Sequence, residues 1–224
     1  MLDKGYVRLV DHMGNDLSIV NAARVSYDKE SESMSERDQS LLTYLLKHEH
    51  TSPLRHAAVT LEIYAPLLVA RQWWKYAVSS THIDDQNGWN ESSRRYITEN
   101  EQFHIPTVWR SFPENSKQGS GDNLSDNVCN MMTQQLIEHV EKSEKLYNLA
   151  MLNNVAPEQA RLFLPAYSMY VRWRWTISLA GMLNFLQQRI AHDAQREIQA
   201  YAQATFKLVS PLYPETFKAS GISL

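Results

Sequence analysis

The sequence predicts a helix-rich α+β fold, because its apolar residues follow two different spacings in separate segments. Apolar and polar residues alternate from Val59 to Tyr64, which indicates a half-buried strand, and again from Tyr170 to Ile177, which indicates a second strand of a mixed or antiparallel sheet. Apolar residues recur every three or four positions from Asp126 to about Asn153 and from Leu179 to Val209, which indicates amphipathic helices. With 224 residues, 43% of them apolar, the chain is expected to form a single domain, 1–224.

Shorter elements are expected in the first third of the chain. Residues 6–10 and 16–20 are predicted to be short strands around a turn at 13–15. Ser35 is expected to cap a helix of about three turns that ends near His48. Pro66 is expected to open a helix through Trp74, since proline suits the first helical turn.

Other segments are predicted from their polar, glycine and proline residues and from their length. Thr81 to Gly88 is polar and is expected to be a loop, and Phe112 to Asp126 is expected to be a flexible surface loop. Pro157 is expected to begin a short helix. One continuous helix over 179–209, at about 1.5 Å per residue, would be longer than a small domain. Part of it is therefore expected to pack against another subunit.

Composition excludes several classes of protein. Lys and Arg number 22 against 25 Asp and Glu, a net charge of −3, which disfavours a general nucleic-acid binder. The single cysteine, Cys129, allows neither an internal disulfide nor a zinc site of several thiolates. We find no secretory leader and no apolar run of about 18 residues, so we expect a cytoplasmic protein without a membrane span.

The strongest chemical signal is the polar run over residues 90–96. Its two adjacent arginines offer planar, permanently charged forks for phosphate oxygens, and its two hydroxyls can complete an anion cradle. Its glutamate can accept from a ring N–H or a ribose hydroxyl. A polar loop that solvates its own charges would look the same, so this run alone leaves both interpretations open. The candidate contacts are Glu91, Ser92, Ser93, Arg94 and Arg95.

A second cluster precedes this run. Gln72 and Lys75 are three residues apart and share a helix face, and the amide of Gln72 offers the donor and acceptor that a pyrimidine edge requires. Trp73 and Trp74 fit either a substrate contact or core aromatic residues, and the second interpretation is favoured. 

Two further clusters lie downstream, and a histidine pair lies upstream. Arg161 stands in an apolar stretch, where a cation is costly unless it is paired, and Arg189 follows Asn184 by five residues on one predicted helix. His48 and His50 have no third ligand at a supporting spacing, so no metal site is expected.

In their order along the chain, these clusters resemble the flavin-dependent thymidylate synthases. Residues 89–96, Trp-Asn-Glu-Ser-Ser-Arg-Arg-Tyr, match the second half of the diagnostic motif of that family: an aromatic residue, Asn-Glu, any residue, Ser, any residue, Arg-Tyr. Several ordered motifs, spread from about Asn21 to Tyr201, are more specific than any one of them. The other matching segments are Ala22 to Ser26, His50 to His56, Ala70 to Trp73, Ala160 to Pro165, Met182 to Arg189 and Ala194 to Ile198.

The resemblance implies a reaction, a fold and an assembly. It implies that the protein binds FAD, takes a hydride from NADPH, and uses methylenetetrahydrofolate to convert dUMP to dTMP by reductive methylation. It also implies the fold of the thymidylate synthase complementing proteins and a homotetramer whose sites are shared between subunits. No cysteine nucleophile is implied, and Cys129 lies outside every matching motif.

The resemblance further implies which residues act. Arg189 is the expected catalytic residue, because a fixed cation at the uracil carbonyl would stabilise the negative charge that builds as C5 becomes nucleophilic. Residues expected around dUMP are Gln72, Trp73, Trp74, Lys75, Glu91, Ser92, Ser93, Arg94, Arg95, Arg161 and Arg189. Residues expected around FAD and folate are Ser26, His50, Ser52, Lys75, Tyr76, Ala77, Glu91, Ser178 and Asn184.

The chain departs from the family pattern on the cofactor side. The Arg-His-Arg of the family is Lys75-Tyr76-Ala77 here, an insert follows at Thr81 to Gly88, and Ser178 and Ala180 replace a frequent Asn and Arg. Three alternatives therefore stay open. They are a variant that releases 5-hydroxymethyl-dUMP, a nucleotide-binding homologue without flavin chemistry, and a single-strand nucleic-acid binder that uses its six tryptophans. The acidic net charge disfavours the last.

Overall fold

The fold is known from a computed structural model that describes residues 1–78, 88–93, 96–97, 101–113 and 119–224. Its strands form one sheet in the order β1-β2-β4-β3, and all neighbouring strands are antiparallel. The strands are β1 (Tyr6–Met13), β2 (Ala58–Pro66), β3 (Gly88–Glu91) and β4 (Tyr170–Ser178). The helices are α1 (Asp16–Arg24), α2 (Glu36–Lys47), α3 (Leu67–Val78), α4 (Asp126–Leu152), α5 (Pro157–Ala160), α6 (Leu179–Ile190), α7 (Arg196–Val209) and α8 (Pro214–Ser220).

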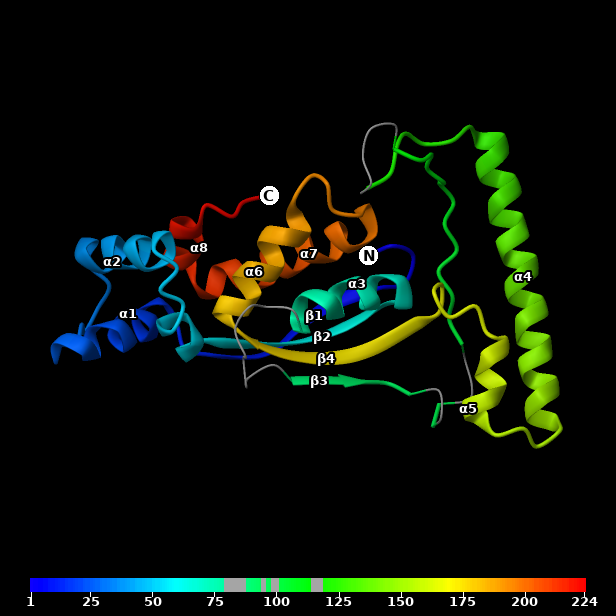
Figure 1. Ribbon diagram of the computed structural model, residues 1–224, viewed down its shortest axis with the longest axis horizontal. Helices are drawn as coiled ribbons and strands as arrows, with labels where there is room; N and C mark the ends of the chain where they lie inside the picture. The colour runs from blue at the N-terminus through cyan, green and yellow to red at the C-terminus, as the bar shows by residue number, and fades with distance from the viewer. Residues whose placement is uncertain (79–87, 94–95, 98–100, 114–118) are drawn as a thin grey trace.

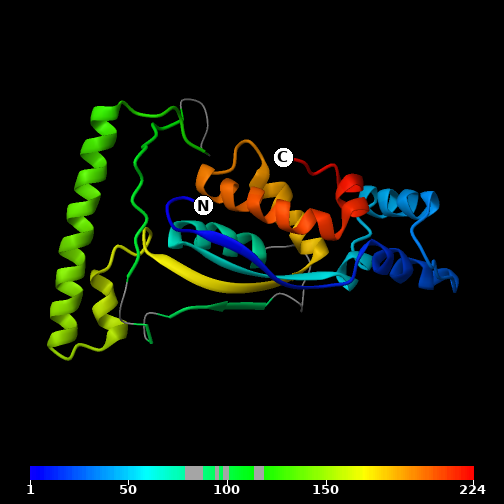
Figure 2. The ribbon, with the colours of Figure 1, turned by 180° about the vertical axis from the view of Figure 1, so that it is seen from behind.

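The helices are distributed unevenly around this sheet. Figure 1 shows α3, α6 and α7 on one side of the strands, and Figure 2 shows the same arrangement from behind. Helices α1, α2 and α8 lie beyond one end of the sheet, and α4 and α5 lie beyond the other (Figure 1). The observed α+β architecture therefore confirms the predicted class, and the sheet is antiparallel.

Aromatic packing joins the sheet to its helices. The indole of Trp73 on α3 lies edge-on to Trp173 and Trp175 of β4, with ring centroids 5.5 Å apart in both pairs. It also stacks on Phe185 of α6 at 4.5 Å. These four side chains expose at most 1% of their surface, and such large aromatic side chains dominate the burial of apolar area in a core. The alternating strand predicted at 170–177 is confirmed.

Strand β2 differs in one respect from its prediction. The strand is present, but it is central in the sheet and buried on both faces rather than half-buried. Glu62 is only 7% exposed, and its carboxylate accepts hydrogen bonds from Tyr6, Arg8 and Arg174. Burial alone would raise the pKa of Glu62, but the bonds from Tyr6 and Arg8 outweigh burial and lower it.

The predictions of helices at 35–48, after Pro66, at 126–153 and from Pro157 are confirmed by α2, α3, α4 and α5. The strand predicted over 16–20 is wrong, because this segment is the start of α1. The Asn15 side chain accepts from Ser18 N, and Ser18 Oγ accepts from Asn15 N. This reciprocal capping box satisfies the free amides of the first helical turn, which favours a helix over a strand.

The single helix predicted over 179–209 is also wrong. Helix α6 ends at Ile190, and α7 begins at Arg196 and packs back against α6. The side chain of Gln199 donates to the carbonyl oxygens of Ile190 and Ala191 at 3.0 and 3.1 Å, so it satisfies acceptors that the end of α6 leaves free. Helix α6 has only 12 residues, and its length does not support packing against another subunit.

Two predicted loops fall partly outside the described residues. Of Thr81 to Gly88, only Gly88 is described, and it begins β3, which the sequence did not predict. Of 112–126, residues 114–118 are not described, and the flanking parts pair through Ser111 N to Asp122 O at 2.9 Å. The flexibility of this loop stays a prediction. Within the part of the chain that the structure describes, no helix has the length and apolar character to cross a bilayer.

We expect Asp38→Asn to lower the free energy of unfolding by about 2 kcal/mol at neutral pH. Asp38 is 1% exposed and accepts hydrogen bonds from Arg24, Ser31 and Ser35. Burial alone would raise the pKa of its carboxyl, but the bonds from Ser35 and Arg24 outweigh burial and lower the pKa from 3.8 to about 2. Because the folded-state pKa is depressed, this stabilisation is present above about pH 4 and is lost towards about pH 2.

Urea unfolding of both proteins at a series of pH values measures this difference. Glu141→Gln, which removes an exposed carboxylate from α4, is the control and is expected to change stability by less than about 0.5 kcal/mol. Equal stability of Asp38→Asn and the unmodified protein at neutral pH would show that the network contributes nothing.

Candidate functional site

The first half of the predicted polar run is a strand. In β3, Trp89 pairs with Trp175 and Glu91 pairs with Trp173. The Trp89 indole stacks on that of Trp173 at 5.0 Å. Beyond the strand, Ser92 N donates to the carbonyl of Arg172 at 2.8 Å. The residues up to Ser92 are therefore held on the edge of β4 and are not a freely solvated loop.

The hydroxyl and carboxyl groups at this edge have distinct surroundings. Ser92 Oγ accepts from the backbone N–H of Arg172 at 3.1 Å, and Ser93 is half-buried. Glu91 is exposed at the strand edge, yet loss of water around its carboxyl raises the pKa above its ordinary value. A hydrogen bond from Trp89 and the positive charge of Arg71 oppose this rise without cancelling it. Arg94 and Arg95 lie outside the described residues.

Helix α3 presents a buried acceptor near this edge. The Oε1 atom of Gln72 is buried and has no hydrogen-bond partner among the described residues. A buried acceptor in that state costs about 1–3 kcal/mol, which a donor from a bound ligand would recover. Lys75 is exposed, and Trp74 is 42% exposed beneath the guanidinium of Arg71, whose Cζ lies 5.7 Å from the ring centroid. The side chains of Tyr76 and Ala77 lie outside the described residues.

Trp73, expected near dUMP, and Ser178, expected near the flavin, both lie in the core. The Trp73 side chain has no exposed surface, because it fills the space between the sheet and α6. Ser178 is also fully buried, and its Oγ accepts from Gly181 N at 3.3 Å as the N-cap of α6. Each side chain therefore has a packing or capping role, and the two ligand contacts stay predictions.

Two of the expected residues lie on α6 itself. Asn184 is half-buried, and Arg189 is only 9% exposed in the last helical turn. Arg189 Nη1 donates to Gln195 Oε1 at 3.4 Å. A cation near the carboxyl end of a helix is stabilised by the helix dipole, so this position suits a buried guanidinium.

The other expected residues lie at opposite ends of the molecule. Ser26, Ser52 and His50 are exposed in the segments that follow α1 and α2, whereas exposed Arg161 follows α5 (Figure 1). Arg161 Nε donates to the carbonyl of Glu158 at 3.1 Å. The part of this chain that the structure describes therefore does not gather all the expected residues into one pocket. The described residues also contain no group of three or more His, Cys, Asp or Glu side chains suited to a metal ion.

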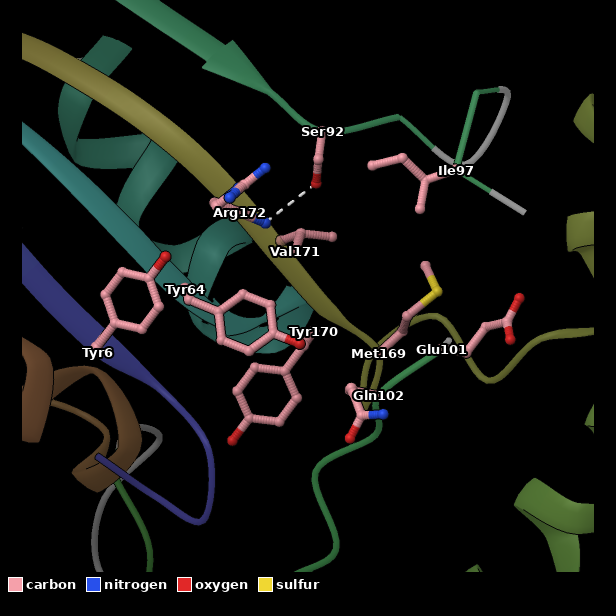
Figure 3. Close-up of a pocket in the computed structure, with 10 residues that line it drawn as sticks. All are labelled: Tyr6, Tyr64, Ser92, Ile97, Glu101, Gln102, Met169, Tyr170, Val171 and Arg172. Carbon is pink, nitrogen blue, oxygen red and sulfur yellow. Dashed lines mark hydrogen bonds between the residues drawn. The ribbon is translucent and has the colours of Figure 1, made fainter. Parts of the chain in front are cut away.

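Two cavities adjoin the expected residues. Figure 3 shows one of about 300 Å³, whose lining includes Ser92, Arg172 and the stacked rings of Tyr64 and Tyr170, 4.8 Å apart. Of these residues, only Ser92 was expected. The alternation along β4 shows that Arg172 faces away from the tryptophans, but nothing in the sequence indicates that it lies beside Ser92. A second cavity, of about 750 Å³, is lined by Ser18, Asn21, Ala22, Val25, Asp28, Lys29, Glu30 and His56.

The fold and these polar edges define an α+β protein with arginine, amide and hydroxyl groups suited to a phosphorylated nucleotide. The family model described as thymidylate synthase complementing protein matches residues 8–215. A flavin-dependent thymidylate synthase of Ehrlichia ruminantium is 35% identical over 221 residues, 98% of this chain and 71% of that protein. One of Thermosipho africanus is 37% identical over 220 residues, 98% of this chain and 92% of that protein.

A solved structure is similar over nearly the same length. The crystal structure of a UMP/dUMP methylase from Streptomyces cacaoi, bound with 5-Br dUMP, matches with a TM-score of 0.80 at 26% identity. The match covers 96% of this chain and 94% of that one. The chain belongs to the thymidylate synthase complementing protein family.

We expect Ser178→Ala to lower the free energy of unfolding by about 1 kcal/mol, the usual cost of removing a serine N-cap. Because the side chain is fully buried, the substitution is not expected to change binding of dUMP or of FAD. Urea unfolding and equilibrium titration with each ligand measure the two effects. Loss of FAD binding with unchanged stability would instead support a direct contact between Ser178 and the flavin.

Proposed function

We propose that this chain catalyses the reductive methylation of dUMP to dTMP as a flavin-dependent thymidylate synthase. In this proposal, methylenetetrahydrofolate supplies the one-carbon unit, and NADPH supplies the hydride through FAD. The family match over residues 8–215 and the names of the relatives support this activity. The structural observation that carries it is the buried, unpartnered Oε1 of Gln72 among the described residues, which suits the N–H group of a uracil ring.

The substrate side of the proposal uses the edge of β3 and the turn after α5. Ser92, Ser93 and Arg161 are proposed to bind the sugar and phosphate of dUMP, together with Arg94 and Arg95. Hydroxyls and backbone amides position an anion, and guanidinium groups bind it through paired donors. Trp74 and Lys75, both exposed on α3, and Glu91 complete the proposed surroundings of the nucleotide.

The chemical step is assigned to Arg189. As C5 of the uracil becomes nucleophilic, before it attacks the one-carbon unit, enolate-like negative charge builds on a carbonyl oxygen of the ring. A guanidinium fixed beside that oxygen stabilises the charge as it develops, and burial strengthens the effect because less water screens it. Arg189 is 9% exposed and in the last turn of a rigid helix, which suits this role.

The polar surroundings of Ser26 fit part of a large cofactor. The cavity of about 750 Å³ adjoins this turn and presents hydroxyl, amide, ammonium and imidazole groups from Ser18, Asn21, Lys29 and His56, beside the carboxyl groups of Asp28 and Glu30. The chemistry that FAD supplies when bound is hydride transfer. Residues proposed to hold FAD or folate are Ser26, His50, Ser52, Lys75, Tyr76, Ala77, Glu91 and Asn184.

We also infer that the complete site is shared between subunits of a homotetramer. Arg161 lies at the α4–α5 end of the chain, whereas Ser26 and Ser52 lie at the α1–α2 end (Figure 1). The residues proposed for dUMP and those proposed for FAD must meet for the reaction, so we infer that different copies of the chain contribute them. The solved relative is a methylase of both UMP and dUMP, so UMP is a second candidate substrate.

We expect added FAD to give the purified protein a bound flavin absorption band that NADPH bleaches in the presence of dUMP. The polar cavity beside Ser26 is the physical reason for expecting FAD to bind. Absorption spectroscopy after removal of unbound flavin measures this directly, and titration with UMP in place of dUMP tests the second substrate. A protein that binds dUMP but never FAD would contradict the synthase proposal and support the alternative of a nucleotide-binding homologue without flavin chemistry.

We expect Arg189→Ala to retain the fold and bound FAD while losing at least about a thousandfold in kcat, because the charge on the uracil oxygen loses its stabilising partner. Single-turnover kinetics, with circular dichroism as the folding check, measures the effect. Arg37→Ala, which removes an exposed arginine from α2, is the matched control and should retain full turnover. Near-normal turnover of Arg189→Ala would exclude the assigned role.

A further inference from the structure

We propose that Gln195 is a positioning residue that holds the Arg189 guanidinium in place without cancelling its charge. The inference rests on the proposed role of Arg189. It concerns the five-residue connection between α6 and α7, whose last residue is Gln195. No residue of this connection was assigned a role by its sequence pattern.

The side chain of Gln195 bonds to Arg189 and does not cap its own helix in the described structure. Gln195 occupies the N-cap position of α7, with φ −61° and ψ 135°. Side chains at this position usually accept from the first free amides of the helix, but the Gln195 side chain makes no such bond in the described structure. Its Oε1 instead accepts from Arg189 Nη1 at 3.4 Å.

The connection that carries Gln195 is braced on both sides. Gln199 Nε2 bonds to the carbonyl oxygens of Ile190 and Ala191, so the first turns of α7 are tied to the end of α6. Ala194 N donates to Ala191 O at 3.0 Å within the turn. A side chain on a braced turn can hold its partner with less loss of entropy than one on a free loop.

A contact from a segment distant in sequence also holds the first turn of α7. Arg110 bonds to Glu197 in the first turn of α7 and donates through Nε to Ser120 Oγ at 2.7 Å. This contact joins Arg110 and Ser120 to the first turn of α7, next to the α6–α7 connection. Gln195 therefore lies between two sets of contacts. One ties α7 to the end of α6 through Gln199, and the other ties α7 to Arg110 through Glu197.

The amide is chemically suited to this task. Its neutral oxygen accepts one guanidinium N–H and adds no negative charge beside Arg189. A carboxylate at the same position would bind the guanidinium more strongly, since charge-assisted bonds are stronger than neutral ones. It would also offset the positive charge that the transition state needs. Stability and catalysis should therefore respond in opposite directions.

The test compares Gln195→Glu and Gln195→Ala in the complete, FAD-loaded protein. We expect Gln195→Glu to be at least as resistant to urea as the unmodified protein, yet to lose about tenfold or more in kcat with the KM for dUMP changed less. We expect Gln195→Ala to lose a similar factor in kcat and to be no more resistant to urea than the unmodified protein. A purely structural role would lower activity only where stability also falls.

Gln188→Glu is the matched control, because it adds the same charge beside Arg189 in sequence but on an exposed position of α6. It is expected to retain wild-type kcat and stability. If Arg189→Ala is inactive while both Gln195 variants turn over normally, the positioning role is excluded and the proposed function stands. If the unmodified protein makes no product from dUMP, the proposed function fails, and the role of Gln195 fails with it.

Discussion

The pairing of β4 with β2 on one side and β3 on the other is the constraint on which the candidate site depends. Strand β4 holds Ser92 through two backbone contacts of Arg172 and continues through Ser178 directly into α6, which carries Arg189. Its tryptophans pack against Trp73 and so also fix α3, which carries Gln72. One strand thus determines where three of the proposed substrate contacts lie, and weakening its packing would displace all of them together.

Much of this fold is predictable from local sequence. Ser35 caps α2 and Pro157 lies in the first turn of α5, as their capping and φ preferences indicate, and α3 begins directly after Pro66, the last residue of β2. Membership of the family is confirmed by matches across nearly the whole chain. The tryptophan alternation along β4 likewise predicts a strand, because it places the large side chains on one face.

The features that escaped prediction depend on partners distant in sequence or on reciprocal bonds. The break after Ile190 contains neither Gly nor Pro, and it is stabilised by Gln199 reaching back across the turn. The strand at Gly88–Glu91 forms because β4 supplies its hydrogen bonds, and nothing within those four residues alternates clearly enough to show it. The buried states of Trp73 and Ser178 arise from packing with distant elements, which motif positions alone do not show. The other assigned ligand contacts remain predictions.

The central claim is that the methylation of dUMP is completed within this site, even though Lys75-Tyr76-Ala77 replaces the Arg-His-Arg of the family. The most direct measurement is the mass of the nucleotide formed from dUMP, methylenetetrahydrofolate, NADPH and the FAD-loaded protein. The account predicts dTMP as the product. Formation of 5-hydroxymethyl-dUMP in its place would contradict the account, because it would mean that water reaches the one-carbon adduct before the hydride does.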